Sequence, residues 1–580
     1  MESPGLKRKY DAIVIGTGVT GGWASKELTE GGLDTLVLER GRMVEHVKDY
    51  PTMNKDPWDF KFRGQATYQD KQRQLKQART GYTTGEASKH WFVDDIKHPY
   101  NEEKRFDWIR GYHVGGKSLM WARMSFRWSE MDFEANKKDG HGIDWPIRYK
   151  DLVPWYEKVE RYIGISGKAE NLPQLPDSIF TPEMPLNCVE LELKEGVEAN
   201  FDDRKVINSR AANLTDPEGR EGRGPCQFRN RCIRGCPYGA YFSSNSSTLP
   251  AAERTGNITL RPHSIVHEII YDEELEKATG VRVIDAETGD KMEFYAEVIF
   301  CCAGAIPSAS ILMQSKSDRF PNGLGNDSGE LGHNIMDHHF KVGATGKSDN
   351  HQDDYYKGRK PAGFFVPRFR NIDEKSTMKD FVRGYGMQGG ASRTDWTEAV
   401  GEMSYGKDLK RELLKPGDWR IGVNCFGECL PYHENKMTLD YNKLDQWGLP
   451  TITFDCEYKE NEKAMRKDAQ EQAVAMLKAA GFKDVQGYNN PCFPGNGIHE
   501  MGTARMGRDP KTSVLNKNNQ IHAVPNVYVT DGACMTSSAS QNPSLTYMAI
   551  TARAANHAVD QFKAGVFQRS SDNTAKIESS

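Results

Sequence analysis

Long apolar runs are absent from this sequence of 580 residues. No stretch reaches the roughly 18 consecutive apolar residues of a membrane-spanning helix, so we expect no transmembrane segment. The charged residues 1–10 contain neither the apolar core nor the cleavage site of a signal peptide. Because neither a transmembrane segment nor a signal peptide is recognised, the chain is expected to be soluble. Its polar end, residues 566–580, is predicted to be disordered.

A strong excess of either charge is also lacking. The formal net charge is −4 and no long basic block occurs, which gives nucleic-acid binding little support. A disulfide framework is not indicated, because the 11 cysteines are odd in number and scattered through a large chain. Three of them nevertheless cluster, at Cys226, Cys232 and Cys236. With 580 residues the chain is long enough for two domains or one large elaborated fold, and its 37% apolar residues allow a sizeable core.

A glycine-rich turn stands between a predicted strand and a predicted helix near the N-terminus. Residues 10–15 (YDAIVI) are largely apolar and β-branched, which is typical of a buried parallel strand. The turn 16–21 (GTGVTG) follows, then a helical stretch 22–30 and a second strand 35–38. This β-α-β context distinguishes a dinucleotide-binding site from an ordinary glycine turn. The sequence therefore predicts a Rossmann-like α/β domain.

Each residue of this motif has a physical task. Gly16 permits the tight turn, Gly18 lets the backbone approach a pyrophosphate, and Gly21 lets the helix pack close to the strand. The helix N-terminus offers unpaired N–H groups and a partial positive charge to the phosphates. Glu39, at the end of the second strand, can accept hydrogen bonds from a ribose diol. The motif by itself does not separate NAD from FAD.

Together with this motif, several further segments resemble the glucose–methanol–choline (GMC) oxidoreductase family over most of the chain. They are Gly111–Trp121 (GYHVGGKSLMW), Glu297–Leu312 (EVIFCCAGAIPSASIL), Leu331–His339 (LGHNIMDHH), Ile498–Gly507 (IHEMGTARMG) and Asn526–Ala549. The resemblance implies that the cofactor is FAD. In some relatives a histidine in the first of these segments is bonded covalently to the flavin. Met120 occupies that place here, so we expect the FAD to be non-covalent.

The resemblance also implies an α/β fold with a discontinuous, Rossmann-like FAD-binding domain. Its expected pieces are residues 8–45, 105–135, 226–340 and 496–565, with a cysteine loop at 224–240. A substrate domain is expected from 341–495 with parts of 140–225. Alternating residues in 420–430 and 451–457 predict antiparallel strands, and 459–480 predicts an amphipathic helix. We therefore expect this domain to be an antiparallel sheet flanked by helices.

The family resemblance indicates which residues surround the FAD and which carry the chemistry. The FAD-contacting residues are expected to be Gly16, Gly18, Gly21, Glu39, Gly115, Gly116, Ser118, Met120, Ala303, Gly304, Asp531, Gly532, Asn542 and Pro543. Alcohol oxidation removes a proton from oxygen and a hydride from carbon, and the flavin accepts the hydride. Histidine suits the base, since its ordinary pKa is about 6.5. By resemblance the base is His499, and Asn542 holds the substrate oxygen.

Three other polar residues allow two interpretations each. His338 and His339 are explained by packing and capping near the flavin as readily as by catalysis. Glu428 could reach substrate hydroxyls, or it could be a solvated residue of a strand.

The cysteine cluster lies in the segment 224–246 (GPCQFRNRCIRGCPYGAYFSSNS). A full iron–sulfur cubane and a zinc site both usually take four ligands, so three thiols, Cys226, Cys232 and Cys236, favour a [3Fe–4S] cluster. The interleaved arginines of this loop favour thiolates and offset the negative charge of a cluster. A cluster with a fourth ligand from elsewhere in the chain, a zinc site that lacks one ligand, and purely structural thiols are the alternatives. The loop resembles that of heteromeric FAD sugar dehydrogenases of the family, which pass electrons from flavin to cluster to cytochrome.

The resemblance therefore implies a dehydrogenase that oxidises a secondary alcohol of a sugar or glycoside. Glucoside 3-dehydrogenases are the group it resembles most, which favours C3, with gluconate 2-dehydrogenases and fructose dehydrogenases as alternatives. The implied partners are a small subunit that carries an export signal and a cytochrome c. The implied location is the periplasm, reached by co-export, with the cytoplasm as the alternative. An oxygen-reducing GMC oxidase with a structural cysteine loop, and a non-catalytic flavoprotein electron carrier, are further hypotheses.

Overall fold

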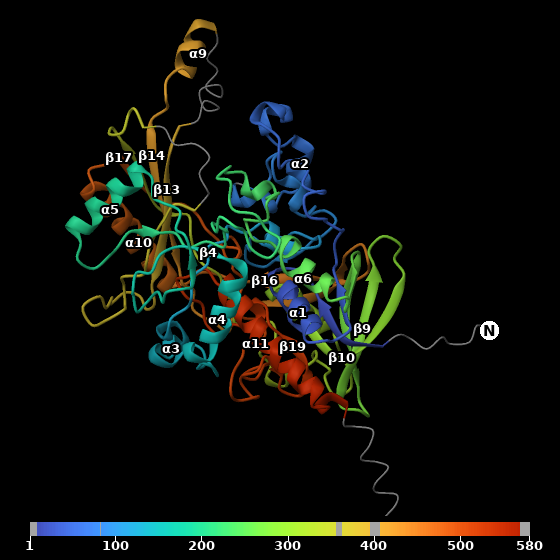
Figure 1. Ribbon diagram of the computed structural model, residues 1–580. Helices are drawn as coiled ribbons and strands as arrows, with labels where there is room; N and C mark the ends of the chain where they lie inside the picture. Colours follow the sequence, from blue (N-terminus) through green and yellow to red (C-terminus); the bar gives the residue numbers. More distant parts are fainter. Residues whose placement is uncertain (1–8, 82, 355–361, 395–405, 569–580) are drawn as a thin grey trace, which may run out of the picture.

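The computed structural model describes residues 9–81, 83–354, 362–394 and 406–568. Two large sheets, one of eight strands and one of six, organise the described chain. Smaller sheets and loops connect them. In Figure 1 the six-stranded sheet lies at the upper left and the eight-stranded sheet below it.

The eight-stranded sheet is built around five parallel strands. In spatial order these are β19 (Val524–Val529), β10 (Lys291–Cys301), β1 (Lys9–Ile15), β2 (Thr35–Leu38) and β7 (Ile258–Arg261). The antiparallel additions are β18 (Gln520–Ile521) beside β19 and the hairpin β8 (Ser264–Asp272)–β9 (Lys277–Asp285) beside β10. Neighbouring strands thus come from the beginning, middle and end of the chain. The carboxyl ends of parallel strands share one edge, where a dinucleotide binds in such sheets.

Helices from distant segments cover this sheet. On one face α1 (Val19–Glu30) packs against α11 (Ser544–Lys563), and α11 packs against α4 (Tyr149–Ile163). Figure 1 shows α1 and α11 beside each other over β19 and β10. Helix α7 (Ala305–Gln314) contacts β8. Because both faces are covered, the central strand β1 is almost continuously apolar and buried, as the sequence predicts.

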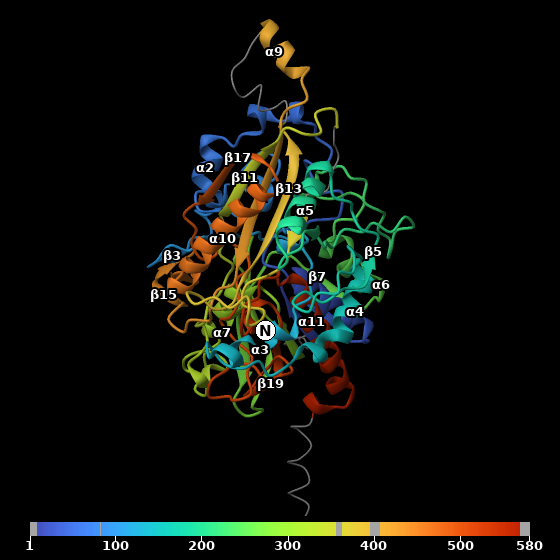
Figure 2. The ribbon, with the colours of Figure 1, turned by 90° about the vertical axis from the view of Figure 1, so that its left-hand side faces the viewer.

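The six-stranded sheet is antiparallel throughout. Its order is β17 (Lys483–Asn489), β11 (Val342–Ser348), β14 (Trp419–Gly427), β13 (Tyr385–Arg393), β12 (Phe364–Val366) and β6 (Ile207–Asn208). Helices α10 (Glu460–Ala479) and α5 (Cys188–Asn200) cover one face, as Figure 2 shows. Side chains of β14 alternate between buried and more exposed positions, which is the pattern of a strand with one covered face. The predicted α/β fold with an antiparallel sheet flanked by helices is confirmed.

Several element boundaries differ from the prediction. Helix α1 begins at Val19, three residues before the expected start. The predicted strand 451–457 forms β16 (Pro450–Asp455), which pairs with β15 (Lys436–Leu444) and β3 (Asn101–Glu102) in a separate three-stranded sheet. Of the predicted disordered tail, residues 566–568 form a short 3-10 helix and residues 569–580 lie outside the described chain. Among the described helices, none is both long and apolar enough to cross a bilayer.

Candidate active site

A cavity of about 490 Å³ runs between the two large sheets. One wall comes from the loops after β1, β2 and β10, and the opposite wall includes Gln388 of β13 and Phe426 of β14. The expected FAD residues that line it are Gly16, Gly18, Glu39, Gly116, Met120, Ala303, Gly304, Asp531, Gly532 and Asn542. The predicted base His499 lines it as well. The expected residues outside this lining are Gly21, Gly115, Ser118 and Pro543.

The N-terminal glycines make room for a ligand and for the helix. Gly16 has φ +96°, and a Cβ there would lie 2.6 Å from the carbonyl oxygen of Cys302. A Cβ on Gly21 would lie 2.0 Å from the carbonyl oxygen of Gly16, so the helix approaches the turn at a distance that only glycine allows. Around Gly18 the space for a Cβ is empty, and no side chain caps the N-terminus of α1. These features fit the pyrophosphate of a dinucleotide.

Glu39 stands at the end of β2 and lines the cavity. One carboxylate oxygen accepts hydrogen bonds from the hydroxyl (2.5 Å) and backbone N–H (3.2 Å) of Thr17, and the other accepts from the N–H of Gly41 (3.0 Å). Burial raises the pKa of this carboxyl, and the three donors act in the opposite direction. These bonds hold the carboxylate at the strand end, where the oxygen that accepts from Gly41 retains a lone pair for a ribose hydroxyl.

The second glycine segment approaches the first from across the cavity. A Cβ on Gly116, which has φ +46°, would lie 3.5 Å from the Cα of Gly18. Ser118 is buried behind this wall, where its hydroxyl accepts a hydrogen bond from the N–H of Ser244 (3.0 Å). Ser118 therefore supports the glycine segment from behind. Met120 lines the cavity in the place where some relatives carry the flavin-linked histidine, which fits a non-covalent flavin.

Asp531 ties two of the expected segments together. One of its carboxylate oxygens accepts from the N–H of Gly304 (2.8 Å) and the hydroxyl of Ser308 (2.5 Å), and the other accepts from the N–H of Ala533 (2.9 Å). The carboxylate therefore joins the loop after β10 to the loop after β19 at the sheet edge. Burial raises its pKa. Because the two loops pack closely together, both of them line the cavity.

His499 and Asn542, the predicted catalytic pair, are directly bonded to each other. Nδ2 of Asn542 lies 3.2 Å from Nε2 of His499, and Nδ1 of His499 lies 3.0 Å from Nδ1 of His338. His338 in turn bonds the carbonyl of Ala539 through Nε2. The structure thus brings together the two residues expected at the site and adds His338 as their neighbour.

This chain of hydrogen bonds determines which ring nitrogens carry protons. The Ala539 carbonyl only accepts, so neutral His338 is protonated at Nε2 and has its lone pair at Nδ1. His499 must then donate from Nδ1, which leaves a lone pair on its Nε2. Asn542 donates to this Nε2, because its Oδ1 already accepts from Nε2 of Gln388 (2.6 Å). The protonation pattern assigned from this network leaves His499 with an unprotonated nitrogen at the cavity, as a general base requires.

The surroundings keep His499 neutral. Its pKa lies well below the ordinary 6.5, first because the ring is buried and second because His338 and Lys117 are nearby. Burial also lowers the pKa of His338 to about 4. Asp337 holds the backbone of this segment, accepting from the N–H groups of Gly497 (2.8 Å) and His499 (3.0 Å). Its own pKa is raised to about 7 by burial.

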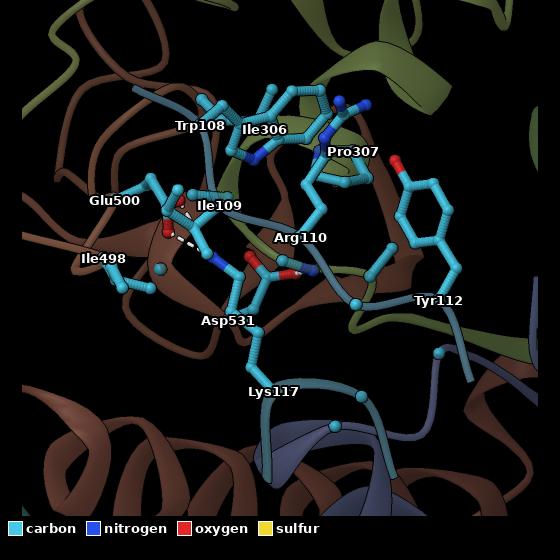
Figure 3. A pocket seen from close by; sticks show the side chains of 18 of the residues that line it. Trp108, Ile109, Arg110, Tyr112, Lys117, Ile306, Pro307, Ile498, Glu500 and Asp531 are labelled. Carbon is cyan, nitrogen blue, oxygen red and sulfur yellow. Dashed lines mark hydrogen bonds and ion pairs between the residues drawn. The ribbon is translucent and has the colours of Figure 1, made fainter. Parts of the chain in front are cut away.

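An ion pair inside the cavity was not expected from the sequence. Nζ of Lys117 lies 2.8 and 2.7 Å from the two carboxylate oxygens of Glu500, and Figure 3 shows the pair beside Asp531. Lys117 belongs to the second glycine segment, and Glu500 follows the predicted base directly. Both lie inside segments that the family resemblance singled out, but nothing in either segment indicates that two residues 383 positions apart are bonded.

His339 and Glu428 do not line the cavity. His339 is fully buried with Nε2 3.2 Å from the sulfur of Met465, so its role is packing. Glu428 is also fully buried and accepts from Arg368 (2.9 Å) and from the N–H of Gly384 (3.1 Å). The interpretation of Glu428 as a solvated strand residue is therefore wrong. Its carboxylate joins the segment after β12 to the segment before β13, and burial raises its pKa to about 7.

The three clustered cysteines lie in an irregular loop beside the cavity. Cys232 begins a short 3-10 helix (Cys232–Arg234), and Ile233 within it lines the cavity. Burial, and then the neighbouring thiols of Cys226 and Cys236, raise the pKa of Cys232 to about 12. The three sulfur atoms are not all within 4.8 Å of one another. This spacing is too wide for a single zinc ion, whereas a polynuclear cluster bonds each thiolate to a different iron. Three thiols on one loop are donors of the kind that such a cluster takes.

The arginines of the cysteine loop bind a neighbouring segment, residues 53–56. Arg229 and Arg234 donate to backbone carbonyls there, at 2.8 Å in each case. Arg231 forms an ion pair with Asp56. These contacts anchor the loop, a role that the sequence-based interpretation of the arginines as charge compensation missed.

Comparisons with known proteins agree with this geometry. The profile of the family described as GMC oxidoreductase matches residues 10–340 and 431–551. The 2-methyl-1,2-propanediol dehydrogenase of Mycolicibacterium austroafricanum is 29% identical over 96% of this chain and 97% of that one. The fructose dehydrogenase large subunit of Gluconobacter japonicus is 26% identical over 96% and 98%. The structure of pyridoxine 4-oxidase from Mesorbium loti, at 15% identity, superposes with a TM-score of 0.60 over 94% of this chain and 98% of that one.

The family matches span well over half of the chain, and the structural likeness shows the same fold. The family resemblance seen in the sequence is thereby confirmed. The chain belongs to the GMC oxidoreductase family, and it is an FAD-dependent oxidoreductase that acts on CH–OH groups.

Proposed function

We propose that the protein is a sugar dehydrogenase that oxidises a secondary alcohol of a glycoside, with C3 of a glucoside as the favoured position. The observation that carries this proposal is the hydrogen-bonded group His338, His499 and Asn542 beside the cavity that the dinucleotide motif also lines. The sugar class is supported by the name of the fructose dehydrogenase relative. The choice of C3 rests on the sequence resemblance, and oxidation of gluconate or fructose is the alternative.

The chemistry divides between the cofactors and the side chains. When bound, FAD supplies a hydride acceptor and a [3Fe–4S] cluster at the cysteine loop supplies one-electron transfer to an external acceptor. His499 takes the hydroxyl proton at Nε2, where the substrate hydroxyl replaces the hydrogen bond that Asn542 donates, while its Nδ1–H stays bonded to His338. Asn542, whose Nδ2 is then released from His499, would donate to the substrate oxygen and orient it. The alcohol thus loses one hydride and one proton and becomes a carbonyl compound.

The route of the electrons out of the protein is part of the proposal. Ile233 belongs to the cysteine loop and lines the cavity, so the loop and the cofactor site share a wall. An external acceptor is then a one-electron carrier, for which a cytochrome c and a small signal-bearing subunit are the proposed partners. Co-export with that subunit to the periplasm is the proposed location, with the cytoplasm as the alternative.

The choice of electron acceptor tests this function. The protein is mixed with methyl glucoside, fructose, gluconate or 1,2-propanediol, and the fate of the electrons is followed with ferricyanide and, separately, with oxygen. We expect the glucoside to reduce the flavin and ferricyanide to reoxidise it, with little peroxide formed. Stoichiometric peroxide would replace the proposal with an oxidase. Reduction by none of the alcohols, together with rapid exchange with a protein donor, would indicate an electron carrier.

His338 is expected to act as the positioning residue that sets the tautomer of His499. Replacing His338 by Leu removes the acceptor for the Nδ1–H of His499. Leaving a buried donor unsatisfied costs about 1–3 kcal/mol, so flavin reduction by the glucoside should slow by about tenfold to a hundredfold. Stopped-flow absorbance of the flavin under anaerobic conditions measures this rate.

The variant His338→Gln is the matched control, since an amide oxygen can accept the same hydrogen bond. It should recover most of the rate, with the same FAD content in both variants. Equal rates for the Leu and Gln variants would show that His338 only fills space.

A further inference from the structure

Gln388 is the side chain through which the six-stranded sheet reaches the predicted catalytic pair. It belongs to β13 and lines the cavity, on the wall opposite the dinucleotide motif. Its Nε2 donates a hydrogen bond to Oδ1 of Asn542 at 2.6 Å, between residues 154 positions apart. The six-stranded sheet and the catalytic pair are therefore joined by a direct contact between side chains.

The strand around Gln388 is rich in glycine. The nine residues of β13 include Gly386, Gly389 and Gly390, and a Cβ on Gly389 would lie 2.2 Å from the carbonyl oxygen of Gly422. Glycine inside a strand weakens it and often marks the close approach of a ligand or of another backbone. Of these nine residues, Gln388 alone lines the cavity. The strand thus presents one polar side chain to the cavity.

The hydrogen bonds of the catalytic pair all run in one direction. Starting from the carbonyl oxygen of Ala539, each side chain donates to the group before it and accepts from the one after it, in the order His338, His499, Asn542 and Gln388. An asparagine amide can present either end, because its terminal torsion is broad and roughly two-fold. The bond from Gln388 to Oδ1 selects the orientation in which Nδ2 of Asn542 faces His499.

The direction of this chain determines what Gln388 presents to the cavity. Because Nε2 donates to Asn542, the amide oxygen Oε1 is left as an acceptor. In the described part of the chain, no residue donates a hydrogen bond to this oxygen, and it is not one of the atoms sealed in the interior without a partner. A hydroxyl group carries the donor that such an oxygen needs. The hydroxyl that is oxidised cannot supply it, since its proton goes to His499.

We propose that Gln388 is a specificity-determining residue, which orients Asn542 through Nε2 and accepts a hydrogen bond through Oε1 from a second hydroxyl beside the one that is oxidised. The inference deepens the proposed function and rests on it, because His499 and Asn542 must hold the reacting hydroxyl. It assigns the ligand class as a vicinal diol or polyol. A site built to bond a second hydroxyl discriminates against an analogue that lacks it, because its acceptor is then left without a partner.

The first test removes the second hydroxyl and the glutamine in turn. The second-order rate constant of anaerobic flavin reduction is measured with methyl glucoside and its 2-deoxy and 4-deoxy analogues, and with 1,2-propanediol and 2-propanol. In the wild-type protein, loss of the hydroxyl that Gln388 binds should lower this constant by about threefold to tenfold, the range of one hydrogen bond. Gln388→Met keeps the length of the side chain and should reduce parent and analogue nearly equally well.

The variant Gln388→Glu separates the two roles of the amide. A carboxylate can accept from a hydroxyl but cannot donate to Oδ1 of Asn542, so at neutral pH flavin reduction by every alcohol should slow by roughly tenfold. A protonated carboxyl regains a donor. The rate should therefore recover as the pH falls toward the pKa of the introduced carboxyl, ordinarily about 4.3. Neither the wild-type protein nor Gln388→Met should gain rate over this range.

Asn424 offers a matched control. It lies on β14 directly opposite Gln388 in the register of the sheet, and its exposed amide does not line the cavity. Its Oδ1 accepts from the hydroxyl of Tyr488 at 2.6 Å. Asn424→Leu should therefore leave the ratio of the rates for parent and analogue at its wild-type value.

Two results would overturn the inference alone. The first is a Gln388→Met protein that discriminates between parent and analogue as strongly as the wild type, because the second hydroxyl would then bind elsewhere. The second is a Gln388→Glu protein whose rate does not rise as the pH falls, because Gln388 would then not orient Asn542. FAD content is measured on every sample, and ratios within one sample are insensitive to misfolded protein. A wild-type flavin that none of these alcohols reduces would remove the proposed function together with this inference.

Discussion

Replacing His499 by Ala is expected to slow reduction of the bound flavin by a glucoside by roughly 10²–10⁴-fold, the usual contribution of a general base. The reason is the lone pair on Nε2, which the bond from Nδ1 to His338 keeps unprotonated. FAD should remain bound, because the residues that shape the dinucleotide site are unchanged. The measurement is the single-turnover rate of flavin bleaching after anaerobic mixing, with FAD content determined on the same sample.

The wild-type pH profile adds an independent check on this base. Its pKa is lowered, so the neutral, active form is present above that pKa and is lost only when the pH falls well below 6.5. We therefore expect no loss of rate from His499 near pH 6.5. His141→Ala, at an exposed position, serves as the control and should react at the wild-type rate. Flavin reduction at near wild-type rate in His499→Ala would rule out this assignment.

Replacing Cys232 by Ser is expected to separate the two halves of the electron route. A serine hydroxyl is a poor substitute for a thiolate ligand of iron, so iron should fall from about three atoms per flavin to near zero. The glucoside should still reduce the flavin, because the contacts of His499 and Asn542 do not involve the loop. Transfer from the reduced flavin to a cytochrome c should then fail. Iron and sulfide analysis, anaerobic flavin reduction and cytochrome reduction measure the three steps.

Cys188→Ser is the matched control for this result. Cys188 is also half-buried, but it begins α5 over the six-stranded sheet. Its substitution should change neither iron content nor electron transfer. A Cys232→Ser protein that retained full iron would contradict the proposed ligand set. Equal loss of iron in both variants would mean that the effect is not specific to the cysteine loop.

The parts of the fold that sequence predicts well are those set by local pattern. The strand, glycine turn and helix at residues 10–30 follow from apolar periodicity and from the need for glycine at positions 16 and 21. Helix α10 likewise follows from its amphipathic pattern. Strand β16 shows the limit, because its pattern predicts an antiparallel strand but not the sheet that it joins. Sheet membership depends on contacts between residues far apart in the chain.

In the candidate site, too, local sequence identifies some residues, whereas contacts between distant residues determine others. His499 and Asn542 stand in segments that resemble the family, so they can be named from sequence. The role of His338 cannot, because it depends on a hydrogen bond between residues 161 positions apart. The contacts of the cysteine-loop arginines with residues 53–56 could likewise not be named, because proximity in sequence does not determine which way a side chain points.

The most direct test of the whole account is anaerobic titration of the purified protein with a glucoside, with flavin absorbance and the EPR signal of the oxidised cluster followed together. We expect about three irons per flavin, bleaching of the flavin, and loss of the cluster signal as electrons arrive. Flavin bleaching in a protein that contains no iron would contradict the electron route. Iron-loaded protein whose flavin no sugar alcohol reduces would contradict the proposed dehydrogenase function itself.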